Sequence, residues 1–312
     1  MTKPGIIFMG TPDFALPALE ALHHHHYPIL AVVTQPDRPA GRGQKEIAPP
    51  VKLLAQKFGL PVLQPVKVKD PVFVETFHSF NPDMVVVAAF GQILPKEIID
   101  FPKWGCLNIH PSLLPKYRGA APLHWSIIRG EIKTGVTIML MDEGMDSGDI
   151  LMQEETEVGP SETFGELHDR LATLGADTLL RTIEQIESGT VQRRAQDAAE
   201  ATFAPRLPKD IGKINWNDSA IHIFNLIRGL SPSPAAYTSI DGLMFKIYKA
   251  EALMGDVQVP PGTVGPPTSE GLPVAASDGY VILKDVQLAG KKRMPVCDFL
   301  RGYRLKPNTS LG

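Results

Sequence analysis

Apolar runs alternate with amphipathic segments through the first 188 residues of the chain. The runs are short, rich in Val and Ile, and bounded by Gly, Pro or Asp, which is typical of buried strands. We expect strands over residues 5–9, 29–33, around 62, 84–89, 107–110, 135–141 and 150–157, and helices after 13 and over 50–58, 71–80, 123–129 and 161–188. This alternation predicts parallel strands joined by right-handed crossovers, that is, a Rossmann-like α/β domain.

The first strand ends in the turn Gly10-Thr11-Pro12-Asp13. We expect Thr11 or Asp13 to cap the helix that follows, because these side chains accept hydrogen bonds from the free N–H groups of a first helical turn. The fingerprint G-x-G-x-x-G is absent from this turn, which argues against a nicotinamide dinucleotide site.

The pattern changes after residue 188. Residues 189–208 carry Arg193-Arg194 and two prolines, and we interpret them as a linker between a catalytic domain, 1–188, and a C-terminal domain, 209–312. One predicted helix, 219–229, opens the C-terminal domain. Short strand-like runs follow over residues 236–240, 244–250, 262–264, 272–276 and 280–287. Five short strands separated by Gly, Pro and Asp turns predict a small antiparallel β-barrel, with the OB-fold as the leading candidate.

Composition narrows the class of protein. At 312 residues, with 43% hydrophobic and 21% charged residues, the chain fits a soluble globular protein of two domains. No apolar run approaches the roughly 18 residues that a membrane-spanning helix requires, so no membrane partner is expected. Two cysteines far apart in sequence, Cys106 and Cys297, exclude a disulfide framework and favour the cytoplasm.

The net charge of −3 does not by itself indicate a nucleic-acid partner. Its distribution is uneven, because residues 209–312 carry 12 Lys and Arg against 9 Asp and Glu. Lys291, Lys292 and Arg293 form one basic cluster there, for which a solvated surface is an equally good interpretation.

A second basic segment interrupts the N-terminal pattern. The sequence T-Q-P-D-R-P-A-G-R-G-Q-K-E-I-A-P over residues 34–49 carries Arg38, Arg42 and Lys45. Connections in α/β domains usually have about 2–6 residues, so an insertion of this length indicates a functional loop.

The candidate chemistry lies in C-L-N-I-H-P-S-L-L-P-K-Y-R-G-A-A-P, residues 106–122. Strand alternation places Asn108 and His110 on one face, and the prolines that follow predict a rigid loop. Asp146, in the acidic segment M-D-E-G-M-D-S-G-D, is a candidate partner for the imidazole. No Ser or Cys nucleophile accompanies these groups, because Cys106 is expected to be a buried packing residue. Direct acyl transfer with oxyanion stabilisation therefore fits best.

Metal sites are not expected. The acidic segment lacks the EF-hand pattern, and neither C-x-x-C nor H-E-x-x-H occurs. The run His23–His26 is interpreted as a solvated helix end, because consecutive side chains point to different sides of a helix.

The chain resembles the folate-dependent formyltransferases over essentially its whole length. The shared segments are I-I-F-M-G-T-P-D-F-A (6–15), A-F-G-Q-I-L-P (89–95), N-I-H-P-S-L-L-P-K-Y-R-G-A-A-P (108–122) and G-V-T-I-M-L-M-D-E-G-M-D-S-G-D (135–149). The loop T-Q-P-D-R-P-A-G-R-G (34–43) and the C-terminal domain narrow the resemblance to the methionyl-tRNA formyltransferase family. One departure is Ser233, which lies between two prolines where family members often have Trp.

The resemblance implies 10-formyltetrahydrofolate as formyl donor, initiator methionyl-tRNA as acceptor, and a role in translation initiation. By position, Asn108, His110 and Asp146 match the catalytic residues. The folate-binding region is matched by Phe90, Gly91, Gln92, Ile93, Leu94, Ser112, Leu113, Leu114 and Pro115. The tRNA-binding candidates are Arg38, Arg42, Lys45, Lys291, Lys292 and Arg293, with Arg42 matching a residue placed against the acceptor end. No metal is implied, and a monomer is expected.

Three alternatives remain at the level of sequence. A formyltransferase acting on a small amine, such as a purine precursor or an amino sugar, needs the same three residues but not the basic loop. A hydrolase releasing formate uses them with water as acceptor. A non-enzymatic tRNA-binding OB protein needs no folate.

Overall fold

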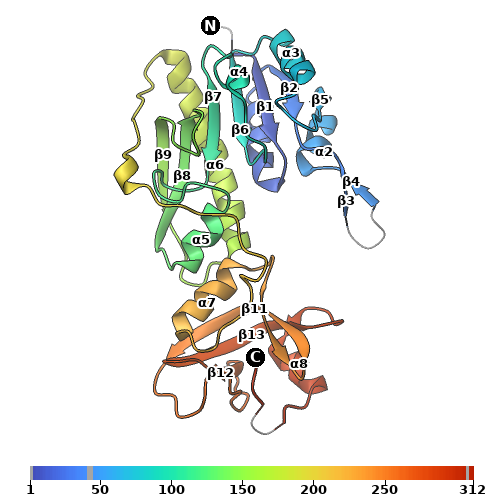
Figure 1. Ribbon diagram of the computed structural model, residues 1–312, viewed down its shortest axis with the longest axis vertical. Coiled ribbons are helices and arrows are strands. Elements are labelled where there is room, and N and C mark those ends of the chain that lie inside the picture. Colours follow the sequence, from blue (N-terminus) through green and yellow to red (C-terminus); the bar gives the residue numbers. More distant parts are fainter. Residues whose placement is uncertain (1–2, 41–44, 307–308) are drawn as a thin grey trace. The chain divides into compact units, whose positions relative to one another are not determined.

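A computed structural model describes residues 3–40, 45–306 and 309–312, and it consists of two compact units (Figure 1). The first unit comprises Met1–Gly119, Thr134–Thr156 and His168–Ala204. The second comprises Ala120–Lys133, Glu157–Leu167 and Pro205–Gly312. Among the described residues, no helix is both long and apolar enough to cross a lipid bilayer.

The first unit is built on a seven-stranded sheet with the order β5-β2-β1-β6-β7-β8-β9 (Figure 1). These strands are β1 (Ile6–Gly10), β2 (Ile29–Val33), β5 (Val62–Leu63), β6 (Met84–Ala88), β7 (Cys106–His110), β8 (Lys133–Leu140) and β9 (Ile150–Glu157). From β5 to β7 all neighbours are parallel, which confirms the Rossmann-like prediction for this half. The sheet is mostly rather than entirely parallel, because β8 pairs antiparallel with β7.

The central strands of this sheet are covered on both faces. β1 and β6 are buried along their whole length, as expected of parallel strands covered on both sides. The first unit contains the helices α1 (Leu16–His24), α2 (Pro50–Lys57), α3 (Pro71–Ser79), α4 (Lys96–Ile99), most of α6 (Phe164–Ser188), and the 3-10 helix η2 (Ala198–Glu200). Phe77 of α3 and Ile98 of α4 pack with Val85 and Val87 of β6 in one cluster. On α6, a Cβ at Gly175 would lie 2.8 Å from Cγ2 of Ile109 in β7.

The predicted cap of the first helix was wrong. The 3-10 helix η1 (Asp13–Ala15) precedes α1, whose N-cap residue is Ala15, and no side chain caps it. The Thr11 hydroxyl instead donates a hydrogen bond to the Phe90 carbonyl at 2.9 Å. Thr11 therefore ties the end of β1 to the loop after β6.

The insertion at 34–49 forms a two-stranded hairpin of β3 (Arg38–Ala40) and β4 (Lys45–Ile47). Asp37 lies just before β3 at the base of this hairpin. It accepts hydrogen bonds from Gln64 Nε2 at 2.7 Å and from Lys52 Nζ at 2.6 Å, which fix the base of the hairpin. These two contacts hold the pKa of the Asp37 carboxyl below its usual range.

The second unit contains α7 (Ala220–Gly229) and an antiparallel β-sheet, as predicted, and also α5 (Pro122–Ile128), a helix that we expected within residues 1–188. Its strands are β10 (Ala236–Ile240), β11 (Leu243–Met254), β12 (Leu272–Ala275), β13 (Gly279–Leu288) and β14 (Met294–Pro295), followed by α8 (Val296–Gly302). The strand expected at 262–264 was wrong, because Thr263 and Val264 form only isolated bridges. β14, of 2 residues, and α8, of 7 residues, were not predicted, because elements this short show little periodicity.

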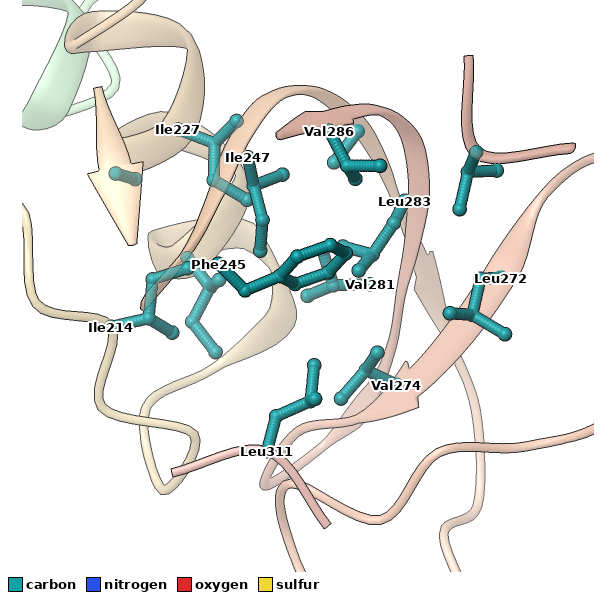
Figure 2. Packing of buried hydrophobic residues seen from close by; sticks show 14 of the residues in the cluster. Ile214, Ile227, Phe245, Ile247, Leu272, Val274, Val281, Leu283, Val286 and Leu311 are labelled. Carbon is teal, nitrogen blue, oxygen red and sulfur yellow. The ribbon is translucent and has the colours of Figure 1, made fainter. Parts of the chain in front are cut away.

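The core of this sheet surrounds Phe245. Figure 2 shows the Phe245 ring extending toward Val281 and Leu283, and all three side chains are fully buried. Ile223 and Ile227 of α7 belong to the same cluster, so this helix and the sheet share one core.

Candidate active site

The carboxyl end of β7 presents Asn108 and His110 on the same face of the strand. His110 is buried, with 4% of its surface exposed, and Asn108 is half-buried. Within the described residues, no hydrogen bond or ion pair engages the Asn108 carboxamide. A partly accessible carboxamide beside a buried imidazole can donate Nδ2–H to a bound oxygen.

The His110 ring is fixed by main-chain geometry. Nε2 lies 3.0 Å from the Tyr117 carbonyl oxygen, which can only accept, so Nε2 donates this hydrogen bond. Nδ1 lies 3.7 Å from Asp146 Oδ2, which is ion-pair range but too long for a direct hydrogen bond. With Nε2 engaged, Nδ1 is the ring nitrogen that can exchange a proton with a ligand.

Asp146 occupies a conformation that few non-glycine residues adopt. Its φ is +50°, in the left-handed region, and its side chain is 19% exposed. Oδ2 accepts a hydrogen bond from the Gly119 amide at 2.8 Å. The structure thus brings Asn108, His110 and Asp146 to one place, although they come from two separate segments.

The loop that follows β7 is held rigidly against β8. Thr137, fully buried and opposite His110 in the sheet, donates to the Ser112 carbonyl at 2.7 Å and accepts from the Leu114 amide at 3.1 Å. Ser112 and Leu114 are themselves buried, at 1% and 3% exposure. Their side chains therefore shape the predicted folate loop from within, while Leu113 and Pro115 are half-buried.

The second predicted folate segment, Phe90–Leu94, divides in the same way. Phe90 and Leu94 belong to the core cluster, and Gln92 Oε1 accepts from the Val68 amide at 2.9 Å. Gly91 is exposed with a φ of +86°, and Ile93 is 93% exposed. Ile93 is thus the apolar side chain of this segment that a ligand can cover.

A pocket of about 410 Å³ opens at the ends of β1, β2 and β6. Its walls are mostly apolar, and its polar groups come from Thr11, Gln35 and Arg38. The strand order reverses between β1 and β6, and ligands of open α/β sheets bind at such a switch point. The apolar lining residues are Pro12, Pro36, Ile47, Ala48, Pro49, Pro50, Ala89 and Phe90, with Gly91 at the rim.

The basic candidates differ in how far they are already paired. Arg38 is exposed, and its guanidinium donates to Gln35 Oε1 at 3.3 Å. Arg42 lies outside the described residues, as does the side chain of Lys45. Lys291 and Lys292 are exposed. Arg293 forms an ion pair with Asp285 at 2.6 Å and stacks over the Tyr248 ring at 4.4 Å, so its charge is largely committed.

The remaining sequence candidates have structural explanations. Cys106 is 1% exposed and packs among core residues, as predicted. The ring of His23 stacks on Phe58, with centroids 3.9 Å apart. Across the described residues, His, Cys, Asp and Glu side chains nowhere gather in a group of three suited to a metal ion.

Sequence reasoning missed three groups that support this site. The Tyr117 carbonyl orients His110, Thr137 anchors the loop after it, and Gln196 Nε2 donates to the Asp146 carbonyl at 2.9 Å. No side-chain pattern marks a main-chain carbonyl, and Gln196 lies in the segment interpreted as a linker. For the Tyr117 carbonyl, the only indication in the sequence is that Tyr117 lies within the motif at residues 106–122.

Comparison with known families and relatives adds to this geometry. The family described as "Formyl transferase" matches residues 5–183, and "Formyl transferase, C-terminal domain" matches residues 206–304. A protein of Syntrophus aciditrophicus (strain SB) named methionyl-tRNA formyltransferase is 55% identical over 312 residues, covering 100% of both chains. One of the same name from Geotalea uraniireducens (strain Rf4) is 49% identical over 307 residues, covering 98% of this chain and 97% of its own.

Solved structures with little sequence identity share the fold. An N-formyltransferase from Helicobacter canadensis, in complex with folinic acid and dTDP-3-aminofucose, has a TM-score of 0.65 at 21% identity, covering 91% of this chain and 98% of its own. HypX from Aquifex aeolicus, in complex with tetrahydrofolic acid, has a TM-score of 0.64 at 17% identity, covering 96% of this chain and 47% of its own.

The two cysteines are expected to differ in reactivity. Burial raises the pKa of the Cys106 thiol to about 12, whereas Cys297 is exposed. Because the thiolate is the reactive form, iodoacetamide at pH 8 should modify Cys297 alone in the folded protein and both cysteines in urea. Peptide mass spectrometry measures this. Equal rates in the folded protein would contradict the buried position of Cys106.

Proposed function

The chain belongs to the formyl transferase family and, within it, to the methionyl-tRNA formyltransferases, and we propose that Asn108, His110 and Asp146 carry out its reaction. The enzyme transfers a formyl group from 10-formyltetrahydrofolate to the α-amine of methionyl-tRNA in translation initiation. The observation that supports the proposed roles is the meeting of an unengaged carboxamide, a buried imidazole and a carboxylate at the end of β7.

Asn108 is proposed to stabilise the developing negative charge. When the amine adds to the formyl carbon, the carbonyl oxygen becomes an oxyanion, and a preorganised N–H donor stabilises it without reorganisation. The Asn108 Nδ2–H is suited to this because no neighbour in the described part of the chain competes for it. The buried His110 beside it lowers the local dielectric and thereby strengthens the interaction.

His110 and Asp146 are proposed to manage the protons. A free α-amine has a pKa of about 7.7–8.0, so a useful fraction is already neutral near pH 7 and needs no strong base to become a nucleophile. After attack, the nitrogen must lose a proton and the leaving folate nitrogen must gain one. His110 Nδ1 is the available ring nitrogen, and Asp146 at 3.7 Å stabilises the ring when both nitrogens are protonated.

The pocket at the switch point is proposed to take the methionyl side chain. Parallel register pairs Val87 of β6 with Asn108 of β7, so the pocket wall at Ala89 and Phe90 continues the strand next to the catalytic one. Neighbouring strands lie about 4.8 Å apart, so this wall is proposed to be within reach of an amino acid whose amine attacks a formyl group held by Asn108. An unbranched thioether adapts well to an apolar pocket.

The folate is proposed to bind between the loops that follow β6 and β7, with Ile93 as an apolar contact. The tRNA is proposed to be held by Arg38, Arg42, Lys45, Lys291 and Lys292, through phosphate contacts. Arg293 contributes less, because Asp285 already neutralises it. We further propose that residues 209–312 serve as the tRNA-binding domain, and that the enzyme acts as a cytoplasmic monomer.

The deciding assay compares acceptors. Formyl transfer from 10-formyltetrahydrofolate is measured with methionyl initiator tRNA and with a dTDP-amino sugar, the class of compound present in the complex of one structural neighbour. Transfer to the tRNA alone is expected, and transfer to the sugar alone would overturn the proposed substrate.

Replacing Asn108 by Ala removes one oxyanion donor. We expect turnover to fall by about 10²–10³, equivalent to roughly 2.7–4 kcal/mol, because the donor acts mainly in the transition state. Steady-state kinetics measures this, and thermal stabilisation by tetrahydrofolate serves as the control for folate binding. Wild-type turnover in Asn108→Ala would remove the oxyanion role.

Filling the pocket should select against the large acceptor side chain. In Ala48→Phe, we expect kcat/KM for methionyl initiator tRNA to fall at least tenfold, which corresponds to about 1.4 kcal/mol. The same tRNA charged with alanine should be affected much less, since its methyl group does not need the pocket. Ala289→Phe, at an exposed turn, is the matched control. Equal losses for both acceptors would show that the pocket holds another part of the tRNA.

The two exposed lysines should contribute to tRNA binding through charge. In Lys291→Ala/Lys292→Ala, the slope of log K against log salt concentration should decrease by about two, because each lost phosphate contact reduces it by about one. Filter binding across a salt series measures the slope. Lys57→Ala/Lys67→Ala, which removes two exposed lysines of the first unit, is the control. An unchanged slope in the first variant would leave Lys291 and Lys292 as a solvated surface.

A further inference from the structure

We propose that Gln196 is a positioning residue for formyl transfer, and that its side-chain amide holds the Asp146 carboxylate against the His110 ring. This inference rests on the role proposed above for Asp146. Gln196 lies 50 residues beyond Asp146 in the chain, and among the described residues its side chain forms no hydrogen bond with His110.

The Gln196 amide uses its donors and its acceptor at the same time. Nε2 donates to the Asp146 carbonyl at 2.9 Å and to the Gly148 carbonyl at 2.8 Å. Oε1 accepts from Arg118 Nε at 3.0 Å and from Arg118 Nη2 at 2.7 Å. Four hydrogen bonds thus connect one half-buried side chain to two segments of the active site.

We call the four hydrogen bonds of Gln196 the Gln196 clamp. On one side it binds the loop at Asp146–Gly148, where the backbone is conformationally constrained. Asp146 has a φ of +50°, a conformation that persists only when surrounding contacts enforce it. Two residues later, a Cβ on Gly148 would lie 1.8 Å from the Leu140 carbonyl oxygen, so the loop passes β8 with no space for a side chain. Gln196 binds the carbonyls on both sides of Ser147 and thereby fixes the loop between these two constrained positions.

On its other side the Gln196 clamp binds Arg118, which adjoins the backbone groups that hold His110 and Asp146. Arg118 is buried, with 8% exposure, and its backbone lies between the Tyr117 carbonyl, which binds His110 Nε2, and the Gly119 amide, which binds Asp146 Oδ2. Its own amide donates to the Thr202 carbonyl at 2.8 Å. The segment carrying Gln196 and Thr202 therefore supports the ring and the carboxylate together.

Only an uncharged amide satisfies both ends. A carboxylate at this position still accepts hydrogen bonds from Arg118. Its other oxygen, however, takes the place of Nε2 and repels the Asp146 and Gly148 carbonyl oxygens, so the contact with the loop is lost. A thioether of similar size releases both ends. Gln196→Glu therefore separates the two functions of the clamp, because it keeps the Arg118 contact while losing the loop contact.

The experiment measures kcat and KM for Gln196→Glu with methionyl initiator tRNA and 10-formyltetrahydrofolate. We expect kcat to fall roughly tenfold to 100-fold, the effect of small displacements of a catalytic group, with both KM values within about twofold of wild type. Gln192→Glu makes the same charge change at an exposed position of the same segment and should keep wild-type kcat. Gln196→Ala should show the same split and provides a second variant if Gln196→Glu folds poorly.

A double-mutant cycle distinguishes positioning from a general loss of structure. Because Gln196 acts through the Asp146 carboxylate, Gln196→Glu should reduce kcat much less in an Asp146→Asn background than in the wild type. Equal losses in both backgrounds, or wild-type kcat in both Gln196 variants, would overturn the inference. If Asp146→Asn itself kept full turnover, the proposed role of Asp146 would fall instead.

Discussion

The proposed active site depends on holding one aspartate in an uncommon backbone conformation beside a buried imidazole. A left-handed φ at a non-glycine residue costs on the order of 1 kcal/mol or more, so Asp146 stays there only because neighbouring contacts outweigh that cost. The Gly119 amide binds the Asp146 carboxylate, and the Gln196 amide binds its carbonyl. Gly119 and Gln196 are far from the 141–149 loop in sequence, but the fold places them next to it.

The sheet explains why the proposed catalytic residues Asn108 and His110 lie at the end of β7. The parallel half, from β5 to β7, places its strand ends at one edge, and the switch point between β1 and β6 opens a pocket there. The antiparallel strand β8 then allows Thr137 to face His110 and to secure the loop that follows. The loop that carries the proposed site is therefore secured where β7 has a parallel neighbour, β6, on one side and an antiparallel neighbour, β8, on the other.

The two compact units have different physical characters. The first buries Val- and Ile-rich strands on both faces and contains the acid, the imidazole and the carboxamide. The second unit has an antiparallel sheet that shares one hydrophobic core with α7, and it carries exposed lysines near β14. The proposed roles, folate chemistry in the first unit and charge-based RNA binding in the second, suit a reaction that joins a small donor to a large polyanionic acceptor.

The sequence by itself determined the alternation of strands and helices, the shared face of Asn108 and His110, and the buried state of Cys106. These features follow from local periodicity, which every residue of an element reports. The tertiary structure alone decided that β8 runs antiparallel to β7, that no side chain caps α1, and that Arg293 is paired with Asp285. It also brought Gln196 to Asp146. Such contacts join distant segments through single hydrogen bonds, and no periodic pattern in either segment encodes its partner.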